Sequence, residues 1–130
     1  MRPRTSKYNA RRTKYNARRT WSDLCKRWFA SAAEAHRADE LQLRALAGDI
    51  CGVEFQPRFV LRKEDPHVHY TADFRYWLPT GRDYIVEDVK GRDTRDSQVR
   101  RAWVLDKLGV RVQVLHAVYR KGRITGWVTL

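Results

Sequence analysis

Disulfide bonds and membrane spans are the first features that this sequence does not support. Only two cysteines, Cys25 and Cys51, occur among 130 residues, too few for the disulfide framework of a small secreted domain. No run of about 18 apolar residues is present, which excludes a membrane-spanning helix. The basic N-terminus is not followed by an apolar stretch, so we expect no secretory signal peptide. These absences favour a protein of the reducing cytoplasm, with no membrane among its partners.

Acidic residues are missing from the first 20 positions. Residues 1–20 contain eight of the 27 Lys and Arg residues and none of the 15 Asp and Glu residues. They therefore contribute +8 to the formal net charge of +12, and residues 21–130 contribute only +4. A hydrophobic fraction of 42% is enough for one compact core. We expect a flexible basic arm at residues 1–20, one folded domain at residues 21–130, and a polyanionic partner.

The arm consists largely of one heptapeptide, because residues 7–13 and residues 14–20 both read KYNARRT. A tyrosine ring can stack on a nucleic-acid base while neighbouring cations neutralise phosphates. A basic tail can also be a solvated segment that aids solubility. We favour an arm that binds DNA and is flexible until bound. Its candidate DNA-binding residues are Lys7, Tyr8, Arg11, Arg12, Lys14, Tyr15, Arg18 and Arg19.

The rest of the chain predicts an α/β domain with a mixed sheet of about five strands flanked by helices. Apolar residues from Trp21 to Phe29 lead into a helix with Ser31 as N-cap and Glu34 at the third helical position, a capping box. Strands follow where apolar and polar residues alternate. The expected order is α-β-β-β-α-β-β, with helices at residues 31–47 and 97–108 and strands at residues 53–61, 68–77, 84–90, 110–118 and 124–129.

Two carboxylates and an amine converge on the second predicted hairpin. If its turn is centred between Thr80 and Gly81, Asp73 lies opposite Asp88. Asp88 and Lys90 are two residues apart and project from the same face of their strand. Adjacent carboxylates repel each other unless a cation lies between them, and oxygen ligands of this kind suit Mg²⁺. A surface ladder of Asp and Lys residues is the alternative interpretation of the same spacing.

These residues resemble the PD-(D/E)XK nuclease signature, which pairs an aspartate with a later (D/E)-x-K tripeptide. Here Asp73 and the tripeptide from Asp88 to Lys90 fill those places, and the expected order of elements resembles the superfamily's restriction-endonuclease-like core. In such nucleases a helical glutamate before the first strand often completes the site, and Glu34 has that position. Two details depart from the pattern, because Ala72 replaces the signature proline and Asp88 replaces the commoner glutamate.

The sequence resembles a family of small phage-encoded nucleases still more closely, and this resemblance spans nearly the whole chain. Its members combine a KYNA(R/K)(R/K)T-like arm with four further motifs, although the arm repeat is doubled in this sequence. The matching segments here are residues 14–20, 31–34 (Ser-x-x-Glu), 56–59 (Gln-Pro-x-Phe), 70–74 (Tyr-x-Ala-Asp-Phe) and 87–91 (Glu-Asp-Val-Lys-Gly).

The resemblance implies a Mg²⁺-dependent DNA endonuclease, with Mn²⁺ expected to substitute. Asp73 and Asp88 would be metal ligands, the Val89 carbonyl a third, Glu34 would assist and Lys90 would be catalytic. Archaeal-type Holliday junction resolvases share this core, a basic N-terminus and a dimeric state. The resemblance therefore favours a homodimer that cuts four-way junctions in DNA recombination and repair, inside a bacterial host if the gene is phage-encoded. A less selective phage DNA-processing nuclease and a catalytically silent nucleic-acid-binding protein are the alternatives.

Several other polar residues are candidates for supporting roles. Four arginines, Arg92, Arg95, Arg100 and Arg101, follow the motif strand and open the second helix, where they either grip phosphates or form a solvated face. Glu87 points away from Asp88 and is expected to have a structural role or to lie at the surface. Gln56 either contacts the site or is an ordinary strand residue. A zinc site at His67 and His69 has little support, because the CxxC and HxxxH spacings are absent.

Overall fold

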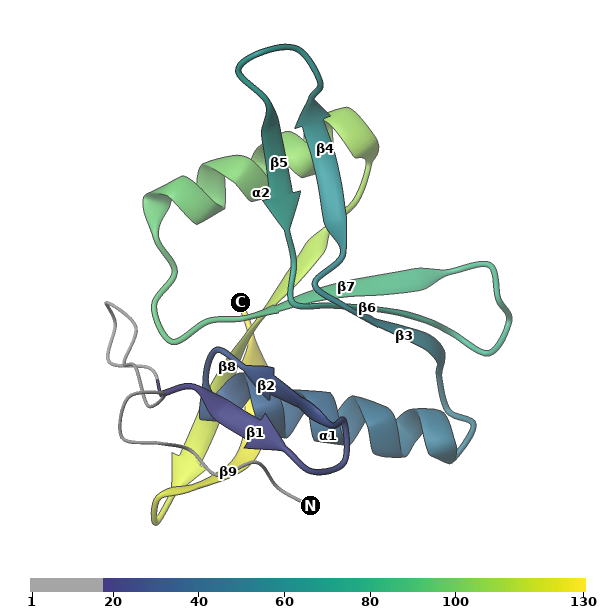
Figure 1. Cartoon of the computed structure of the whole chain (residues 1–130), viewed down its shortest axis with the longest axis vertical. Coiled ribbons are helices and arrows are strands. Elements are labelled where there is room, and N and C mark those ends of the chain that lie inside the picture. The colour runs from purple at the N-terminus through teal and green to yellow at the C-terminus, as the bar shows by residue number, and fades with distance from the viewer. Residues whose placement is uncertain (1–17) are drawn as a thin grey trace.

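A mixed five-stranded sheet forms the centre of the molecule (Figure 1). The computed structural model describes residues 18–130, so the predictions for Lys7, Tyr8, Arg11, Arg12, Lys14 and Tyr15 lie outside the described residues. Strand order in the sheet is β3-β6-β7-β8-β9, with β7 and β8 parallel and the other neighbours antiparallel. The elements are β1 (Thr20–Ser22), β2 (Arg27–Phe29), α1 (Ala32–Leu46), β3 (Cys51–Phe55), β4 (Arg58–Arg62), β5 (Val68–Thr71), β6 (Phe74–Trp77), β7 (Tyr84–Val89), α2 (Arg95–Leu108), β8 (Val112–Arg120) and β9 (Arg123–Thr129).

The predicted α/β class and the mixed five-stranded sheet are confirmed. Ser31 caps α1 by accepting a hydrogen bond from the Glu34 N–H at 3.1 Å, as the capping-box pattern predicts. The second helix begins at Arg95, two residues earlier than expected, because Thr94 rather than a later residue is its N-cap. Gly109 ends that helix in the left-handed conformation. None of the helices in residues 18–130 has the length and apolar character needed to cross a bilayer.

The predicted lead-in at residues 21–29 is wrong, because those residues form the small β1–β2 hairpin. Trp21 and Trp28 face each other across it with ring centroids 5.5 Å apart. The apolar residues Trp21, Trp28 and Phe29 thus belong to strands, and the helix begins after them, with Ser31 as its N-cap. A turn at residues 23–26, where Lys26 has a positive φ of 57°, separates the strands.

Two predicted strands are each divided into two. The expected strand at residues 53–61 breaks at Gln56, which has a positive φ of 55° and precedes Pro57. The expected strand at residues 68–77 breaks at Ala72 and Asp73. In both cases one half stays in the main sheet, as β3 or β6, and the other half leaves it to form the β4–β5 hairpin. Alternation continues through both breaks, so the sequence alone did not reveal them.

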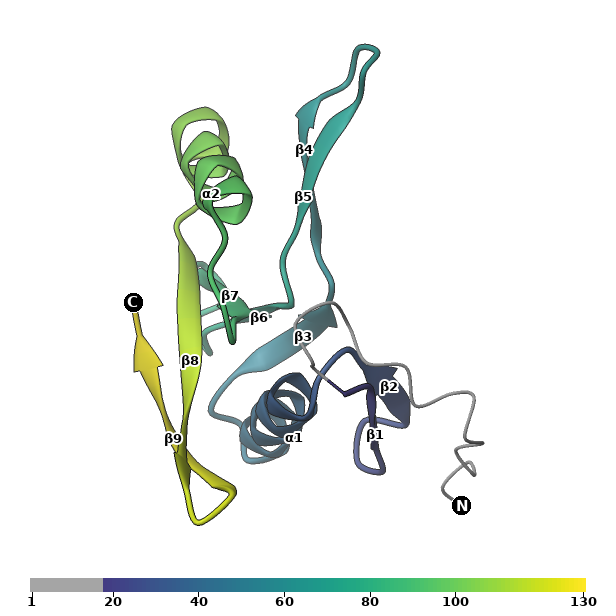
Figure 2. The same cartoon turned by 90° about the vertical axis from the view of Figure 1, so that its left-hand side faces the viewer.

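The sheet separates two apolar clusters. On one face Ala38 and Leu41 of α1 pack against Phe74 and Tyr76 of β6. On the other face, Val104 of α2 packs with Val86 of β7 and with the apolar side of the β4–β5 hairpin. Figure 2 shows α2 and this hairpin on one side of β6 and β7, with α1 and the β1–β2 hairpin on the other side. The strands between them carry the candidate site.

Gly52 provides a test of the sheet's edge. Its φ of 62° is in the left-handed region, and a Cβ atom there would lie 2.9 Å from Cδ1 of Trp77. We expect Gly52→Ala to lower the free energy of unfolding by about 2–3 kcal/mol, because backbone strain of about 1–2 kcal/mol adds to the clash. Gly81→Ala is the matched control, since its φ is 71° with no atom within 4 Å of the added Cβ. Equal losses in urea unfolding would contradict the role of Trp77.

Candidate functional site

Asp73 and Asp88 lie side by side where β6 begins and β7 ends. The predicted register is confirmed, because Phe74 pairs with Glu87 and the next residues out are Asp73 and Asp88. The backbone N–H of Asp73 donates to Oδ1 of Asp88 at 2.9 Å, and the N–H of Val89 donates to Oδ2 of Asp73 at 2.7 Å. Each carboxylate is therefore held by the backbone of the other strand.

The break between β5 and β6 leaves the backbone N–H and carbonyl of Asp73 available for hydrogen bonds with β7 and with Gln56. The Asp73 carbonyl accepts from the Gln56 N–H at 2.9 Å, while its own N–H also lies 3.1 Å from the Glu87 carbonyl. Ala72 donates to the Pro57 carbonyl at 3.0 Å. Gln56 thus acts through its backbone, and its side chain is exposed.

Glu34 approaches the two aspartates from the first turn of α1. Its Oε2 accepts from the Ala30 N–H at 3.0 Å, one residue before the N-cap. Glu34 is 9% exposed, and its carboxyl group is close enough to Asp73 to raise the pKa of that aspartate. The structure therefore brings together the three predicted acids, which lie on α1, β7 and the β5–β6 junction.

Two cations border this acidic cluster. Nζ of Lys90 lies 4.0 Å from Oδ2 of Asp88, so the predicted placement of both side chains on one face is confirmed. Arg101 of α2 is near enough for its charge to lower the pKa of Asp88. Its guanidinium also pairs at 2.6 Å with Asp93, which lies in the loop that joins β7 to α2.

Burial dominates the protonation of the aspartates. It raises the pKa of Asp88 from 3.8 to about 6, although Lys90, the Asp73 N–H and Arg101 each oppose the shift. Burial also raises the pKa of Asp73 well above its usual value, and the hydrogen bond to Glu34 and the charge of Glu34 raise it further. Neighbouring carboxylates without a nearby cation of higher charge behave in this way.

The donor set is compatible with Mg²⁺ held mainly by Asp73 and Asp88. Oδ2 of Asp88 is buried and has no hydrogen-bond partner among residues 18–130, and such orphaned oxygens are rare in folded proteins. In that part of the chain no group of three or more His, Cys, Asp or Glu side chains is arranged so that it could hold a metal ion, so the fit rests on the two aspartates. Mg²⁺ is commonly held by one or two carboxylates, with water and phosphate oxygens completing its octahedron.

Glu87 has a structural role that anchors the site. Its carboxylate is 1% exposed and accepts from Nε of Arg37 at 2.8 Å, from Nη2 of Arg37 at 2.7 Å and from the Tyr76 hydroxyl at 2.5 Å. Burial, and then the hydrogen bond to Glu87, raises the pKa of Tyr76 to about 12. Arg37 lies three residues after Glu34 on α1, so this contact fixes the helix turn that carries Glu34. Sequence reasoning missed Arg37, which looks like any other helical arginine.

The predicted DNA-binding arginines among the described residues lie on different elements of the chain. Arg18 is exposed, and Arg19 stacks over the Trp28 ring at 4.9 Å. Arg92 and Arg95 are exposed between β7 and the start of α2. Arg100 bonds to the His69 carbonyl at 3.3 Å and to Asp96 at 3.3 Å, which ties α2 to the β4–β5 hairpin. Contact of these side chains with DNA stays a prediction.

Removing the cation of the anchoring pair should be severe. We expect Arg37→Met to lower the free energy of unfolding by about 3–5 kcal/mol, because Glu87 would stay buried without its counter-charge. The double variant Arg37→Met/Glu87→Met should regain most of that loss, since neither charge then remains in the core. Arg111→Met, at an exposed arginine, is the control and should change stability by less than about 0.5 kcal/mol. Additive losses in urea unfolding would contradict direct pairing.

Asp88 should make stability depend on pH when chelator is present. Its pKa is higher in the folded state, about 6, than the ordinary 3.8, so the folded protein binds this proton more tightly than the unfolded chain. The contribution to stability is complete below about pH 4 and is lost as pH rises through 6, with a total of about 3 kcal/mol. We expect Asp88→Asn to flatten urea-unfolding stability between these pH values and to be more stable than wild type near neutrality. Parallel pH profiles would refute the assignment.

Comparisons with known proteins place the chain in a family but supply no function. No curated protein matches the sequence, and no solved structure matches it either. One family model, described as "Protein of unknown function (DUF1064)", matches residues 6–125. That match includes both heptapeptides and every candidate acid of the site. The chain therefore belongs to the DUF1064 family.

Proposed function

We propose that this protein is a Mg²⁺-dependent DNA endonuclease that hydrolyses phosphodiester bonds, with branched DNA, above all four-way junctions, as its substrate. The observation that carries the proposal is the pairing of a half-buried Asp73 with a buried Asp88, with an orphaned Oδ2 on Asp88 and a lysine 4.0 Å from it. Buried charges in proteins are normally paired. A surface ladder of Asp and Lys residues, the alternative interpretation, would be exposed, whereas Asp88 is 1% exposed.

Asp73, Asp88 and the Val89 carbonyl are the residues that would hold the metal, with Glu34 assisting. When bound, Mg²⁺ or Mn²⁺ would supply positive charge to a phosphate oxygen and lower the pKa of a water molecule. The protein's own contribution is to fix the two carboxylates by backbone hydrogen bonds, so that they need not reorganise during the reaction. The raised pKa values of both aspartates would return toward normal beside a divalent cation.

Lys90 has the position of a residue that acts on the attacking water or on the phosphate. Its ammonium lies on the same face as Asp88, and its side chain is 26% exposed. In this place it would orient the water and stabilise negative charge that develops on the phosphate. Arg101, tied to Asp93, would add positive potential without direct contact with the reacting atoms.

The restriction-endonuclease-like fold, the homodimer and the choice of branched DNA belong to the same proposal. In support, the main sheet and α2 contain a β-β-β-α-β succession, formed by β3, β6, β7, α2 and β8. The helix α2 connects β7 to β8, and these two strands are parallel. Val99 and Trp103 of α2 are 52% and 39% exposed, which leaves apolar surface for a second copy. Two sites related by a twofold axis would make the paired cuts that a four-way junction requires.

Cleavage assays with the full chain test both the activity and the substrate. A labelled four-way junction, a matched linear duplex and a single strand are incubated with Mg²⁺ or with chelator. We expect paired symmetric nicks in the junction with Mg²⁺ and none with chelator. Equal cutting of all three DNAs would indicate the less selective nuclease, and binding without any cutting would indicate the silent binder.

Asp88→Asn tests the site itself. We expect it to reduce cleavage by at least about 10³-fold, because it removes a metal ligand, and to leave DNA affinity within about twofold. Asp106→Asn makes the same chemical change at an exposed position of α2 and should cut like wild type. Normal cutting by Asp88→Asn would show that the site lies elsewhere.

A further inference from the structure

The β4–β5 hairpin projects away from the sheet and packs on α2 with one side. Figures 1 and 2 show it rising from the middle of the molecule beside α2. Its buried residues, Phe59, Leu61 and Tyr70, pack toward Val104 of α2. Lys107 of α2 donates to the Leu61 carbonyl. Among residues 18–130, nothing buries the exposed side chains of β4 on the side opposite α2.

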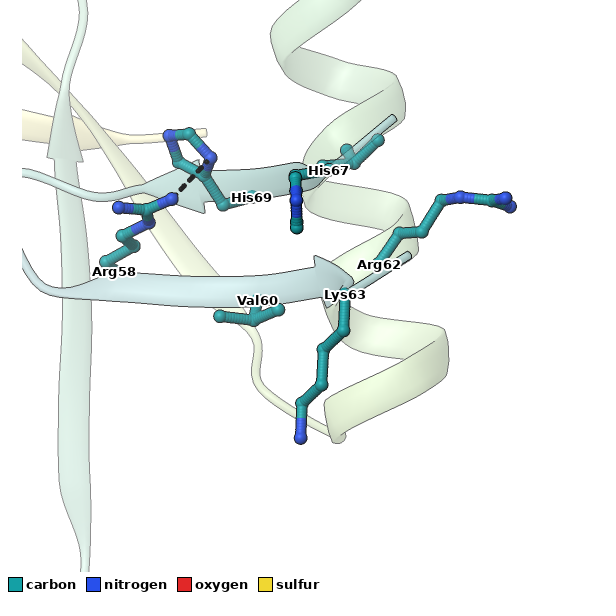
Figure 3. Close-up of a pocket in the computed structure, with 7 residues that line it drawn as sticks. Arg58, Val60, Arg62, Lys63, His67 and His69 are labelled. Carbon is teal, nitrogen blue, oxygen red and sulfur yellow. Dashed lines mark hydrogen bonds between the residues drawn. The ribbon is translucent and has the colours of Figure 1, made fainter. Parts of the chain in front are cut away.

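That uncovered side is basic. On β4, Arg58, Val60 and Arg62 are exposed and alternate with the buried Phe59 and Leu61. Lys63 and His67 follow at the turn, and His69 pairs with Val60 across the hairpin. Together these side chains line a pocket of about 240 Å³ that contains no carboxylate (Figure 3). We call this surface, made of Arg58, Val60, Arg62, Lys63, His67 and His69, the basic face.

The cations of the basic face have no acidic partner. Among residues 18–130, neither Arg58, Arg62 nor Lys63 forms an ion pair with a carboxylate. Nη2 of Arg58 lies 3.1 Å from the Nδ1 atom of His69, as the dashed line in Figure 3 indicates. A guanidinium can only donate hydrogen bonds, so this contact neutralises none of its charge.

The basic face begins at the candidate site. The two strands of the hairpin join the sheet through Pro57 and Ala72, and the Asp73 carbonyl accepts from the Gln56 N–H at 2.9 Å. Arg58 is therefore two residues beyond Gln56, and Arg62 is four residues farther out. A strand rises about 3.3 Å per residue, so these arginines are separated by about 13 Å along it, the axial rise of about four base pairs.

We propose that the basic face binds the phosphate backbone of double-stranded DNA adjacent to the bond that is cut. This inference rests on the proposed nuclease function for the identity of the polyanion, and it adds a contact surface apart from the arm and the start of α2. The hairpin tip carries Glu64 and Asp65, which would repel phosphates. The DNA therefore lies along the side of the hairpin, and the tip does not enter a groove.

A single added negative charge in the basic face provides the sharpest test. Val60 is 43% exposed in the middle of the basic face, so substitution there should spare the core. In a full-length Asp88→Asn background with chelator, we expect Val60→Glu to bind a labelled duplex about tenfold more weakly than Val60→Gln in fluorescence anisotropy. The matched pair is Val118→Glu and Val118→Gln on β8, where the residue is 40% exposed. Equal penalties at both positions would overturn the proposal.

The salt dependence of the same binding reports the number of phosphates involved. We expect the triple variant Arg58→Gln/Arg62→Gln/Lys63→Gln to make the plot of log affinity against log salt concentration less steep by about 2–3, since each lost phosphate contact removes about 0.9. Arg120→Gln/Lys121→Gln/Arg123→Gln removes the same charge from the turn between β8 and β9 and should leave the slope within about 1. Unequal slopes support the basic face, whereas equal slopes would mean that only net charge matters.

The outcomes separate this inference from the proposed function. Binding is measured without cleavage, so a duplex-affinity loss specific to the basic face stands even if wild-type protein cuts no DNA. Conversely, Mg²⁺-dependent cutting with unchanged affinity in the Val60→Glu and triple variants would overturn the basic face and leave the nuclease proposal intact. Weaker binding by Glu64→Gln/Asp65→Asn would overturn the side-on arrangement, because neutralising the tip should not weaken phosphate contact.

Discussion

The buried ion pair between Arg37 and Glu87 is the constraint on which the rest of the candidate site depends. It joins α1 to the central strand of the sheet through two hydrogen bonds, at 2.8 and 2.7 Å. A hydrophobic contact would allow α1 to rotate or slide slightly, whereas a bidentate pair sets both the direction and the distance. Glu34 is one helical turn away, so its approach to Asp73 follows from this pair. Two consecutive residues of β7 therefore have different roles. Glu87 fixes the position of α1, and Asp88 belongs to the acidic cluster of the candidate site.

The candidate site is acidic, whereas the chain as a whole carries a large positive net charge. A protein of formal charge +12 keeps three carboxylates together where burial raises the pKa of two of them. Protein interiors normally avoid such groups unless a partner compensates them. The surrounding cations, Lys90 and Arg101, compensate only in part. The divalent ion that we propose would account for both the convergence of the acids and the incomplete compensation.

The sequence predicted the pairing of Asp73 with Asp88 better than it predicted the path of the chain. The register that places Asp73 beside Asp88 follows from one turn and from the two-residue period of strands, both local features, and it is confirmed. The breaks at Gln56 and Asp73 depend on where each half-strand finds its partner, which is a tertiary matter. Phe59, Leu61 and Tyr70 keep the alternation of a sheet strand because the detached hairpin also has one buried face, against α2. Arg37 was missed for a similar reason, since its partner is 50 residues away.

The junction of the β4–β5 hairpin with the sheet has a consequence for how this family can vary. Gln56 and Asp73 are hydrogen-bonded to each other, and so are Pro57 and Ala72, so the chain leaves the sheet and returns to it at the same point. The distal part of the hairpin, beyond the residues that pack on α2, can therefore lengthen, shorten or change its charge without altering the register of β6 and β7. The length and charge of the hairpin can therefore change independently of the acidic residues at β6 and β7 among members of the family.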